Sequence, residues 1–263
     1  MLIQTPEVKT PIIKVRNLEK SYGVNQVLRG INMDVYPGQI VGYIGPNGAG
    51  KSTTVKILTG LIEEYSGEIE INGRPLNESI QEVKSIIGYV PENAELYDVL
   101  TPLEYLDFIG KLYMMDEKVI FDRANKLLAS FGLSAYAGKR MDTFSKGMRQ
   151  KVLLISGILH NPKILILDEP LSGLDANSVI LVKEVIYKLA KAGKTIFYCS
   201  HMMDVVEKVS DRILVINQGE IVANGTFDEL KEREGETLEK IFTKLTGKED
   251  SYDEAQDIIN ALE

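Results

Sequence analysis

The chain has little of what several classes of protein need. Its 263 residues include one cysteine, Cys199, so neither an internal disulfide nor a cysteine-cluster metal site can form. No apolar stretch approaches the roughly 18 residues that a membrane span needs, and no basic segment followed by an apolar one opens the sequence. We therefore expect a cytoplasmic protein without a membrane span or secretory signal.

An excess of positive charge is also absent. Of the 38 acidic and 30 basic residues, 12 and 5 lie in the segment 228–263, so this segment carries most of the net charge of −8. The remainder is close to neutral, which disfavours bulk binding of nucleic acid, and no nucleic-acid partner is expected. What the chain does have is 44% hydrophobic residues, enough for a sizeable core.

Apolar segments in the first hundred residues predict strands. The segments 12–18 and 27–36 are rich in Val and Ile, which favours an antiparallel edge layer. A short apolar run at 39–44 leads into a glycine-rich segment, and 54–61 has helical character. We expect an antiparallel layer beside a strand–loop–helix unit, with a further strand at 66–71.

The middle of the chain predicts helices. At 101–104 the sequence Thr-Pro-Leu-Glu combines a capping box with a proline at the first helical position. Helical spacing continues over 117–130, and a further helix is expected from Ser145. Residues 101–160 are therefore interpreted as an all-helical insert.

Strands and helices alternate again after the insert. Strands are expected at 164–167, 195–199, 213–216 and 220–223, with a helix at 178–190. Apolar strands separated by helices are typical of a parallel α/β sheet. The acidic segment has apolar residues at helical spacing and predicts a helical appendage. The resulting domain limits are 1–100, 101–160, 161–227 and 228–263.

A glycine-rich motif follows the apolar run at 39–44. Residues 45–53 match the pattern G-x-x-x-x-G-K-[ST], which wraps backbone N–H groups around phosphates at the start of a helix. Lys51 is expected to reach the β- and γ-phosphates of ATP, and Ser52 to bind Mg²⁺. The predicted nucleotide-binding residues of this loop are Gly45, Asn47, Gly48, Ala49, Gly50, Lys51, Ser52 and Thr53.

Two carboxylates end the apolar run at 164–167. In a P-loop nucleotidase, the carboxylate after such a strand holds Mg²⁺, and a second one can activate the attacking water. We assign Asp168 to the metal and Glu169 to the general base. These motifs predict the α/β fold of a P-loop nucleoside triphosphatase, with a mostly parallel core sheet, an antiparallel N-terminal β layer and an all-helical insert.

A third motif lies between these two. Residues 144–150 read Phe-Ser-Lys-Gly-Met-Arg-Gln and are similar to the Leu-Ser-Gly-Gly-Gln signature of one family. With its motifs in this order, the chain resembles the ATP-binding subunits of ABC transporters over about residues 12–225. Ser145 is a good helix cap, and the start of its helix can face a phosphate. The resemblance implies that Ser145 and Gly147 bind the ATP held by the opposite subunit.

The resemblance assigns three more residues to nucleotide binding. Asp175 ends a Leu-Ser-Gly-Leu-Asp segment that looks like the D-loop at the dimer seam. His201 resembles the switch histidine that hydrogen-bonds the γ-phosphate, whereas His160 is interpreted as structural. Tyr22 lies where the family stacks an aromatic side chain on adenine.

The sequence departs from the family pattern at three positions. Glu92 stands in the place of the Q-loop glutamine, where we expect it to accept a hydrogen bond from the water of the metal. In the signature, Lys146 replaces a glycine and Met148 a glutamine. These features look like the branch of ABC-2 type exporters, in which the membrane subunits are separate chains.

The resemblance implies an ATPase that dimerises around two ATP and Mg²⁺, as a homodimer or with a related chain. It would drive export through polytopic permease subunits and lie on the cytoplasmic face of the cell membrane through them. By analogy, the permease contact is placed between Glu92 and the helical insert, including Glu95 and Tyr97.

Three other functions stay open at this point. One is an importer subunit, which shares the ATPase chemistry. Another is a soluble ABC ATPase acting on ribosomes or DNA, which the single phosphate loop and an insert without sustained heptads disfavour. A P-loop kinase or GTPase is disfavoured by the signature at 144–150.

Overall fold

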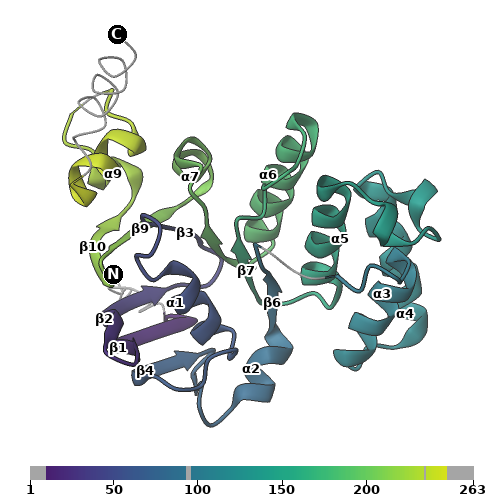
Figure 1. Ribbon diagram of the computed structural model, residues 1–263, viewed down its shortest axis with the longest axis horizontal. Coiled ribbons are helices and arrows are strands. Elements are labelled where there is room, and N and C mark those ends of the chain that lie inside the picture. Colours follow the sequence, from purple (N-terminus) through teal and green to yellow (C-terminus); the bar gives the residue numbers. More distant parts are fainter. Residues whose placement is uncertain (1–9, 93–95, 234, 248–263) are drawn as a thin grey trace, which may run out of the picture.

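The larger of two sheets runs through the centre of the protein (Figure 1). The computed structural model describes residues 10–92, 96–233 and 235–247. The spatial order of the sheet is β10-β9-β3-β8-β7-β6, and all neighbours are parallel except β9 and β10. The strands are β3 (Ile40–Ile44), β6 (Ile87–Val90), β7 (Ile164–Asp168), β8 (Thr195–Cys199), β9 (Arg212–Asn217) and β10 (Glu220–Gly225). The expected mostly parallel core sheet is confirmed.

Burial on both faces explains why the central strands are uninterrupted apolar runs. All residues of β3, β7 and β8 are buried, as in other sheets that are covered on both sides. Tyr43 of β3 and Phe197 of β8 pack with their ring centroids 5.1 Å apart. The hydroxyl of Tyr43 lies 3.1 Å from that of Thr54 in α1 (Lys51–Leu58). The sheet is thus a firmly packed base for the loops at its carboxyl edge.

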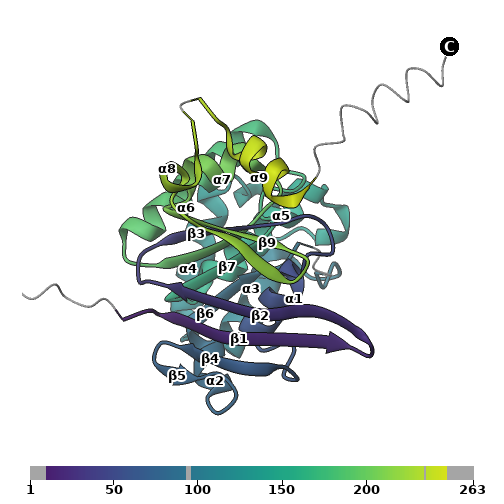
Figure 2. The ribbon, with the colours of Figure 1, turned by 90° about the vertical axis from the view of Figure 1, so that its left-hand side faces the viewer.

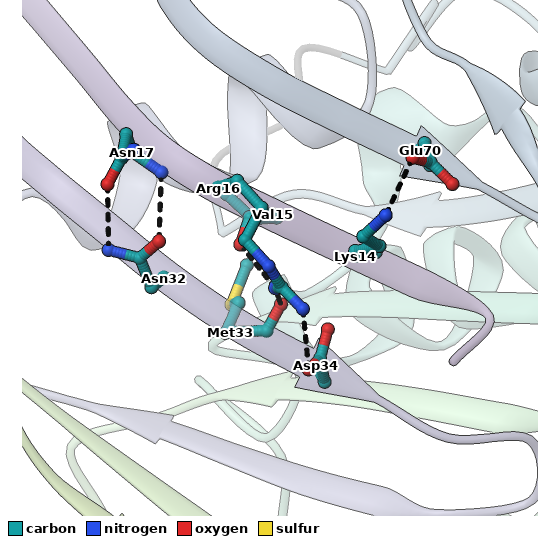
Figure 3. Close-up of polar contacts among 8 residues, drawn as sticks. All are labelled: Lys14, Val15, Arg16, Asn17, Asn32, Met33, Asp34 and Glu70. Carbon is teal, nitrogen blue, oxygen red and sulfur yellow. Dashed lines mark hydrogen bonds and ion pairs between the residues drawn. The ribbon is translucent and has the colours of Figure 1, made fainter. Parts of the chain in front are cut away.

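An antiparallel sheet lies beside the central one, as Figure 2 shows. Its order is β2-β1-β4-β5. The strands are β1 (Ile13–Tyr22), β2 (Asn25–Val35), β4 (Ser66–Ile71) and β5 (Arg74–Pro75). Ion pairs cross this sheet, with Lys14 at 2.9 Å from Glu70 and Arg16 at 2.8 Å from Asp34 (Figure 3). The expected antiparallel N-terminal layer is confirmed.

The helices of the middle segment gather at one end of the molecule, away from the antiparallel sheet (Figure 1). They are α3 (Pro102–Leu112), α4 (Glu117–Ser130) and α5 (Lys146–Leu159). The capping box is present, because Thr101 Oγ1 accepts from Glu104 N at 3.2 Å and the Glu104 carboxylate accepts from Thr101 N at 2.8 Å. The all-helical insert is confirmed, whereas the domain limits stay predictions.

Some elements were not expected from the sequence. Two short helices, α2 (Ile80–Ile86) and α7 (Met203–Val209), bury only one or two side chains each, so their apolar pattern is weak. β6 becomes a strand through parallel pairing with β7. α1 begins at Lys51 rather than at 54, because the end of the phosphate loop forms its first turn. The long α6 (Ala176–Lys191) begins two positions earlier than the expected helix at 178–190.

The acidic segment begins with packed helices. These are α8 (Phe227–Leu230) and α9 (Leu238–Thr246), the first of which begins one residue before the segment. Leu238 and Ile241 are buried, and Leu238 N donates to the Glu207 carboxylate at 2.9 Å. The expected helical spacing is confirmed for α9, while residues 248–263 lie outside the described part. Within the described ranges, we find no helix whose length and apolar character would suit a bilayer span.

Candidate nucleotide-binding site

The glycine loop connects β3 to α1 at the carboxyl edge of the central sheet. Gly48 and Gly50 have φ angles of +79° and +113°, a region of backbone conformation that L side chains rarely adopt. Gly50 occupies the N-cap of α1 without a side-chain cap, and the first N–H groups of a helix have no partner inside the helix. The loop therefore offers backbone donors and a positive helix end to an anion.

Lys51 supplies a cation at the same place. Its Nζ donates to Gly45 O at 2.6 Å and to Pro46 O at 3.0 Å, so the ammonium lies back over the loop. Burial lowers the pKa of Lys51, while nearby carboxylates, including those of Asp168 and Glu169, act in the opposite direction. A phosphate in the loop can take over the hydrogen bonds that the two carbonyls now receive.

Asp168 is the last residue of β7 and is only 6% exposed. Burial raises its pKa to about 6, and the carboxylates of Glu92 and Glu169 act in the same direction. Lys51 lowers this pKa by its positive charge. A cation bound beside Asp168 would favour its ionised form, which burial and the two other carboxylates disfavour.

Glu169 follows Asp168 with an unusual backbone. Its φ angle is +48°, and its N–H donates to Cys199 O at 2.9 Å. Both carboxylate oxygens have a partner, since Ser200 Oγ donates to Oε2 at 3.1 Å and Oε1 lies 2.9 Å from His201 Nδ1. The carboxylate is therefore held by the end of β8.

One cavity of about 630 Å³ joins these groups, a volume that suits a small-molecule ligand. It opens at the carboxyl ends of the parallel strands, where open α/β sheets bind their ligands. Its lining residues are Asn25, Val27, Asn47, Gly48, Gly50, Lys51, Ser52, Thr53, Glu92, Asp168, Glu169 and His201. Most of the predicted site residues are thus brought together.

Asn25 and Val27 at the start of β2 were missed by the sequence analysis. No motif marks them, and only their proximity to Tyr22 in the sequence could have suggested them. Tyr22 itself is half exposed at the end of β1 and is not among the lining residues. Lys20 Nζ lies 5.2 Å from the centre of its ring. Stacking of Tyr22 on adenine stays a prediction.

Gly45 and Ala49 belong to the loop without lining the cavity. A Cβ atom on Gly45 would lie 2.3 Å from Ile216 O, so this position admits only glycine without a shift of β9. Ala49 is 3% exposed and packs in the core. These two residues therefore pack the loop against the core and do not face the cavity.

The three remaining predicted site residues, Ser145, Gly147 and Asp175, do not line the cavity. Ser145 caps α5 by accepting from Met148 N at 3.2 Å, and Asp175 caps α6 by accepting from Ser178 N at 3.0 Å. Ser145 and Gly147 lie at the start of α5, and Asp175 lies at the start of α6.

The oxygen donors near the loop fit Mg²⁺ that arrives with a nucleotide. The available donors are the hydroxyl of Ser52 and the carboxylates of Glu92, Asp168 and Glu169, and Mg²⁺ prefers such oxygen ligands. In the described residues, no group of three or more His, Cys, Asp or Glu side chains is arranged to hold a metal on its own. Mg²⁺ is commonly bound by one or two carboxylates together with nucleotide phosphates.

A glycine loop between a buried strand and a helix, a lysine at its end and a carboxylate on a nearby strand define a P-loop nucleoside triphosphatase. The model of the ABC transporter family matches residues 28–172, more than half of the chain. An ABC transporter ATP-binding protein of Methanocaldococcus jannaschii is 38% identical over 93% of this chain and 89% of its own. This chain therefore belongs to the ABC transporter family and is an ATP-binding ATPase of that family.

Other relatives agree with this assignment. The linearmycin resistance ATP-binding protein LnrL of Bacillus subtilis is 37% identical over 85% of this chain and 72% of its own. A solved ATP-binding subunit of an ABC transporter is 32% identical, with a TM-score of 0.84 over 89% of this chain and 99% of its own. A dimeric ATP-binding cassette with bound ADP and Pi, in a post-hydrolysis state, is 25% identical, with a TM-score of 0.76 over 81% of this chain and 98% of its own.

Proposed function

We propose that this chain is the ATP-hydrolysing subunit of an ABC-2 type exporter. Two copies, or one copy and a related ATPase chain, close head to tail around two ATP and Mg²⁺ and act on separate membrane subunits. The proposal rests on one observation: Ser145, Gly147 and Asp175 do not line the cavity that contains Lys51 and Glu169. In a composite site, this group completes the cavity of the opposite chain.

Binding of the nucleotide follows from the loop geometry. The N–H groups at the start of α1 and the Lys51 ammonium hold the phosphates. Ser52 and Asp168 would hold Mg²⁺, and Glu92 would accept a hydrogen bond from a water on the metal. Mg²⁺ supplies positive charge at the oxygens of the phosphates when it is bound. Tyr22 stacks on adenine beside Asn25.

Hydrolysis requires a group that takes a proton from water. Glu169 fits this role, because its carboxylate lines the cavity and Ser200 and His201 fix both of its oxygens. With Nδ1 of His201 directed at Glu169, the rest of the exposed ring is available to the γ-phosphate. Phosphoryl transfer depends mainly on positioning and on the stabilisation of charge, which the fixed carboxylate and the Lys51 ammonium provide.

Exposed apolar side chains on and beside the helical insert support a docking surface for the permease. Tyr97 and Phe108 are 59% and 40% exposed, and their rings meet edge to face with centroids 5.7 Å apart. Leu112 and Phe121 add exposed apolar area on α3 and α4. Groups of exposed apolar side chains mark interaction surfaces. Of the predicted contact residues, Glu95 lies outside the described part. Docking there would place this chain on the cytoplasmic face of the membrane.

Export, rather than import, is supported by two observations. LnrL is named for resistance to linearmycin, and a relative with that name fits removal of a compound from the cell. The signature residues Lys146 and Met148 are those that resemble the ABC-2 branch. The substrate itself would be selected by the membrane subunits.

The experiment is affinity purification of tagged Glu169→Gln from its native cells with ATP in mild detergent, followed by mass spectrometry. We expect a polytopic membrane protein and no separate substrate-binding protein, since slow hydrolysis holds the ATP-bound complex together. The control is the same variant with the additional change Lys51→Ala, which should lose both ATP and the partner. A substrate-binding protein in the complex would indicate import, and ribosomal or chromosomal partners would overturn the transport function.

A further inference from the structure

The start of α5 contacts the segment that follows Glu169 in the same chain. Gln150 is 4% exposed, and its Nε2 donates to Pro170 O at 3.0 Å. A Cβ atom on Gly147 would lie 2.7 Å from Gly173 O, so the two backbones are in close contact. The first turn of α5 thus lies directly against residues 170–173.

Lys146 adds a contact that a glycine at this position would not make. Its Nζ donates to Ser172 Oγ at 3.0 Å. Its aliphatic stem covers Gly173, since a Cβ atom there would lie 2.8 to 3.2 Å from Cδ, Cγ and Cε of the lysine. Gly173 has a φ angle of +74°, so the turn at this point keeps its shape only with glycine or with strain.

Ser172 is connected back to Glu169. Its N–H donates to Glu169 O at 3.1 Å and closes a tight turn. The backbone of Glu169 is itself held at a φ angle of +48°, a conformation that persists only when its surroundings enforce it. This hydrogen bond connects Ser172 directly to the backbone that carries the Glu169 carboxylate.

These contacts connect two different ATP sites once two cassettes are paired. In the proposed dimer, Ser145 and Gly147 at the start of α5 face the ATP of the opposite chain, whereas Glu169 faces the ATP of its own chain. We propose that Lys146 is a positioning residue that couples the two sites by transmitting the engagement of α5 through Ser172 to Glu169. This inference rests on the proposed function, because it requires the composite dimer.

The test measures ATP hydrolysis against ATP concentration for the full chain and for Lys146→Met, Lys146→Arg, Ser172→Ala and the double variant Lys146→Met/Ser172→Ala. Methionine keeps an unbranched stem but loses the ammonium, and arginine can still donate to Ser172. For the unaltered chain we expect a Hill coefficient well above 1, as two coupled sites require. Lys146→Met should bring the Hill coefficient close to 1 and lower kcat about three- to tenfold. Lys146→Arg should restore most of both.

The double variant separates coupling from other roles of the lysine. If the bond to Ser172 carries the effect, Ser172→Ala alone resembles Lys146→Met, and the double variant is no worse than either. The inference would be overturned if the losses of activity in the two single variants add up in the double variant, or if Ser172→Ala keeps a normal Hill coefficient. Lys146 would then act without Ser172. A third outcome would also overturn the inference. If the variants unfold at a lower temperature and Lys146→Arg does not restore the Hill coefficient, the lysine has only a structural role.

Failure of the inference can be told apart from failure of the proposed function. Sedimentation of Glu169→Gln with ATP reports dimerisation independently of Lys146. An ATP-dependent dimer with a Hill coefficient that Lys146→Met leaves unchanged contradicts the coupling alone. A chain that stays monomeric with ATP contradicts the composite site and the coupling together.

Discussion

Glu169 and His201 meet at the carboxyl ends of β7 and β8, with Oε1 of the carboxylate 2.9 Å from Nδ1 of the imidazole. The two side chains differ in exposure, at 12% for Glu169 and 73% for His201. The carboxylate is thus shielded and fixed, while the imidazole reaches into the open cavity. A base that is held in this way needs little reorganisation before it accepts a proton.

The first prediction concerns this carboxylate. Glu169→Gln should bind ATP normally and hydrolyse it at least about a hundredfold more slowly, the scale expected for loss of a general base. The amide keeps the size of the carboxylate and one acceptor oxygen but cannot take the proton. Phosphate release by the purified variant measures the rate, and Glu184→Gln on the exposed side of α6 is the matched control. Near-native turnover would remove Glu169 from the role of base.

The second prediction concerns the group that lies outside the cavity. Ser145 is exposed at the start of α5, so an arginine there should leave nucleotide binding unchanged while blocking the opposite subunit. We expect Ser145→Arg to abolish ATP-dependent dimerisation in sedimentation experiments. Thr237→Arg is the control, because it removes a similar helix cap from α9 far along the chain. An unchanged dimer in Ser145→Arg would contradict the composite site.

The sequence was sufficient for those parts of the site that local chemistry dictates. The phosphate loop needs glycines with left-handed backbone, and β7 needs an unbroken apolar run because both of its faces are buried. Both features are visible as residue types at fixed spacing. The position of Asp168 near the phosphate loop is also predictable, because the carboxyl ends of parallel strands lie at the same edge of the sheet.

Other parts depend on tertiary packing that no local pattern records. β6 is only four residues long and is a strand because β7 pairs with it. Asn25 enters the cavity because the antiparallel sheet lies beside the loop. The bond from Lys146 to Ser172 joins positions 26 residues apart, and the sequence showed Lys146 only as a departure from the family pattern.

The third prediction tests the contact between the helical insert and the central sheet. A Cβ atom on Gly88 in β6 would lie 2.0 Å from Gly157 O in α5, so Gly88→Ala must push strand and helix apart. We expect a loss of about 3 kcal/mol in the free energy of unfolding, at the upper end of overpacking effects. Gly138→Ala is the matched control, since a Cβ atom there meets open space. Equal stability of the two variants in urea unfolding would show that the insert is not packed this closely.

The last prediction concerns His160, which packs at the end of α5. Its ring stacks on Tyr113 with centroids 3.6 Å apart, and Nε2 lies 3.0 Å from Ile87 O. Nδ1 is buried without a hydrogen-bond partner in the described part of the structure. Burial lowers the pKa of His160 to about 4, and the positive charges of Arg123 and Lys194 act in the same direction. The folded chain therefore holds this ring neutral, with Nε2 as the donor.

The sign of the pH effect follows from this lowered pKa. Between about pH 4 and 6.5, the unfolded chain binds a proton at His160 that the folded chain does not, so His160 makes the fold less stable as the pH falls through this range. Above about pH 6.5 the ring is neutral in both states, and the effect vanishes. His160→Gln keeps a donor for Ile87 but does not titrate. On acidification from about pH 7.5 to 5, it should lose on the order of 1 kcal/mol less stability than the unaltered chain, a value reduced for partial exposure. Urea unfolding at both pH values measures the difference, and parallel losses in the two proteins would show that His160 charges freely in the folded state.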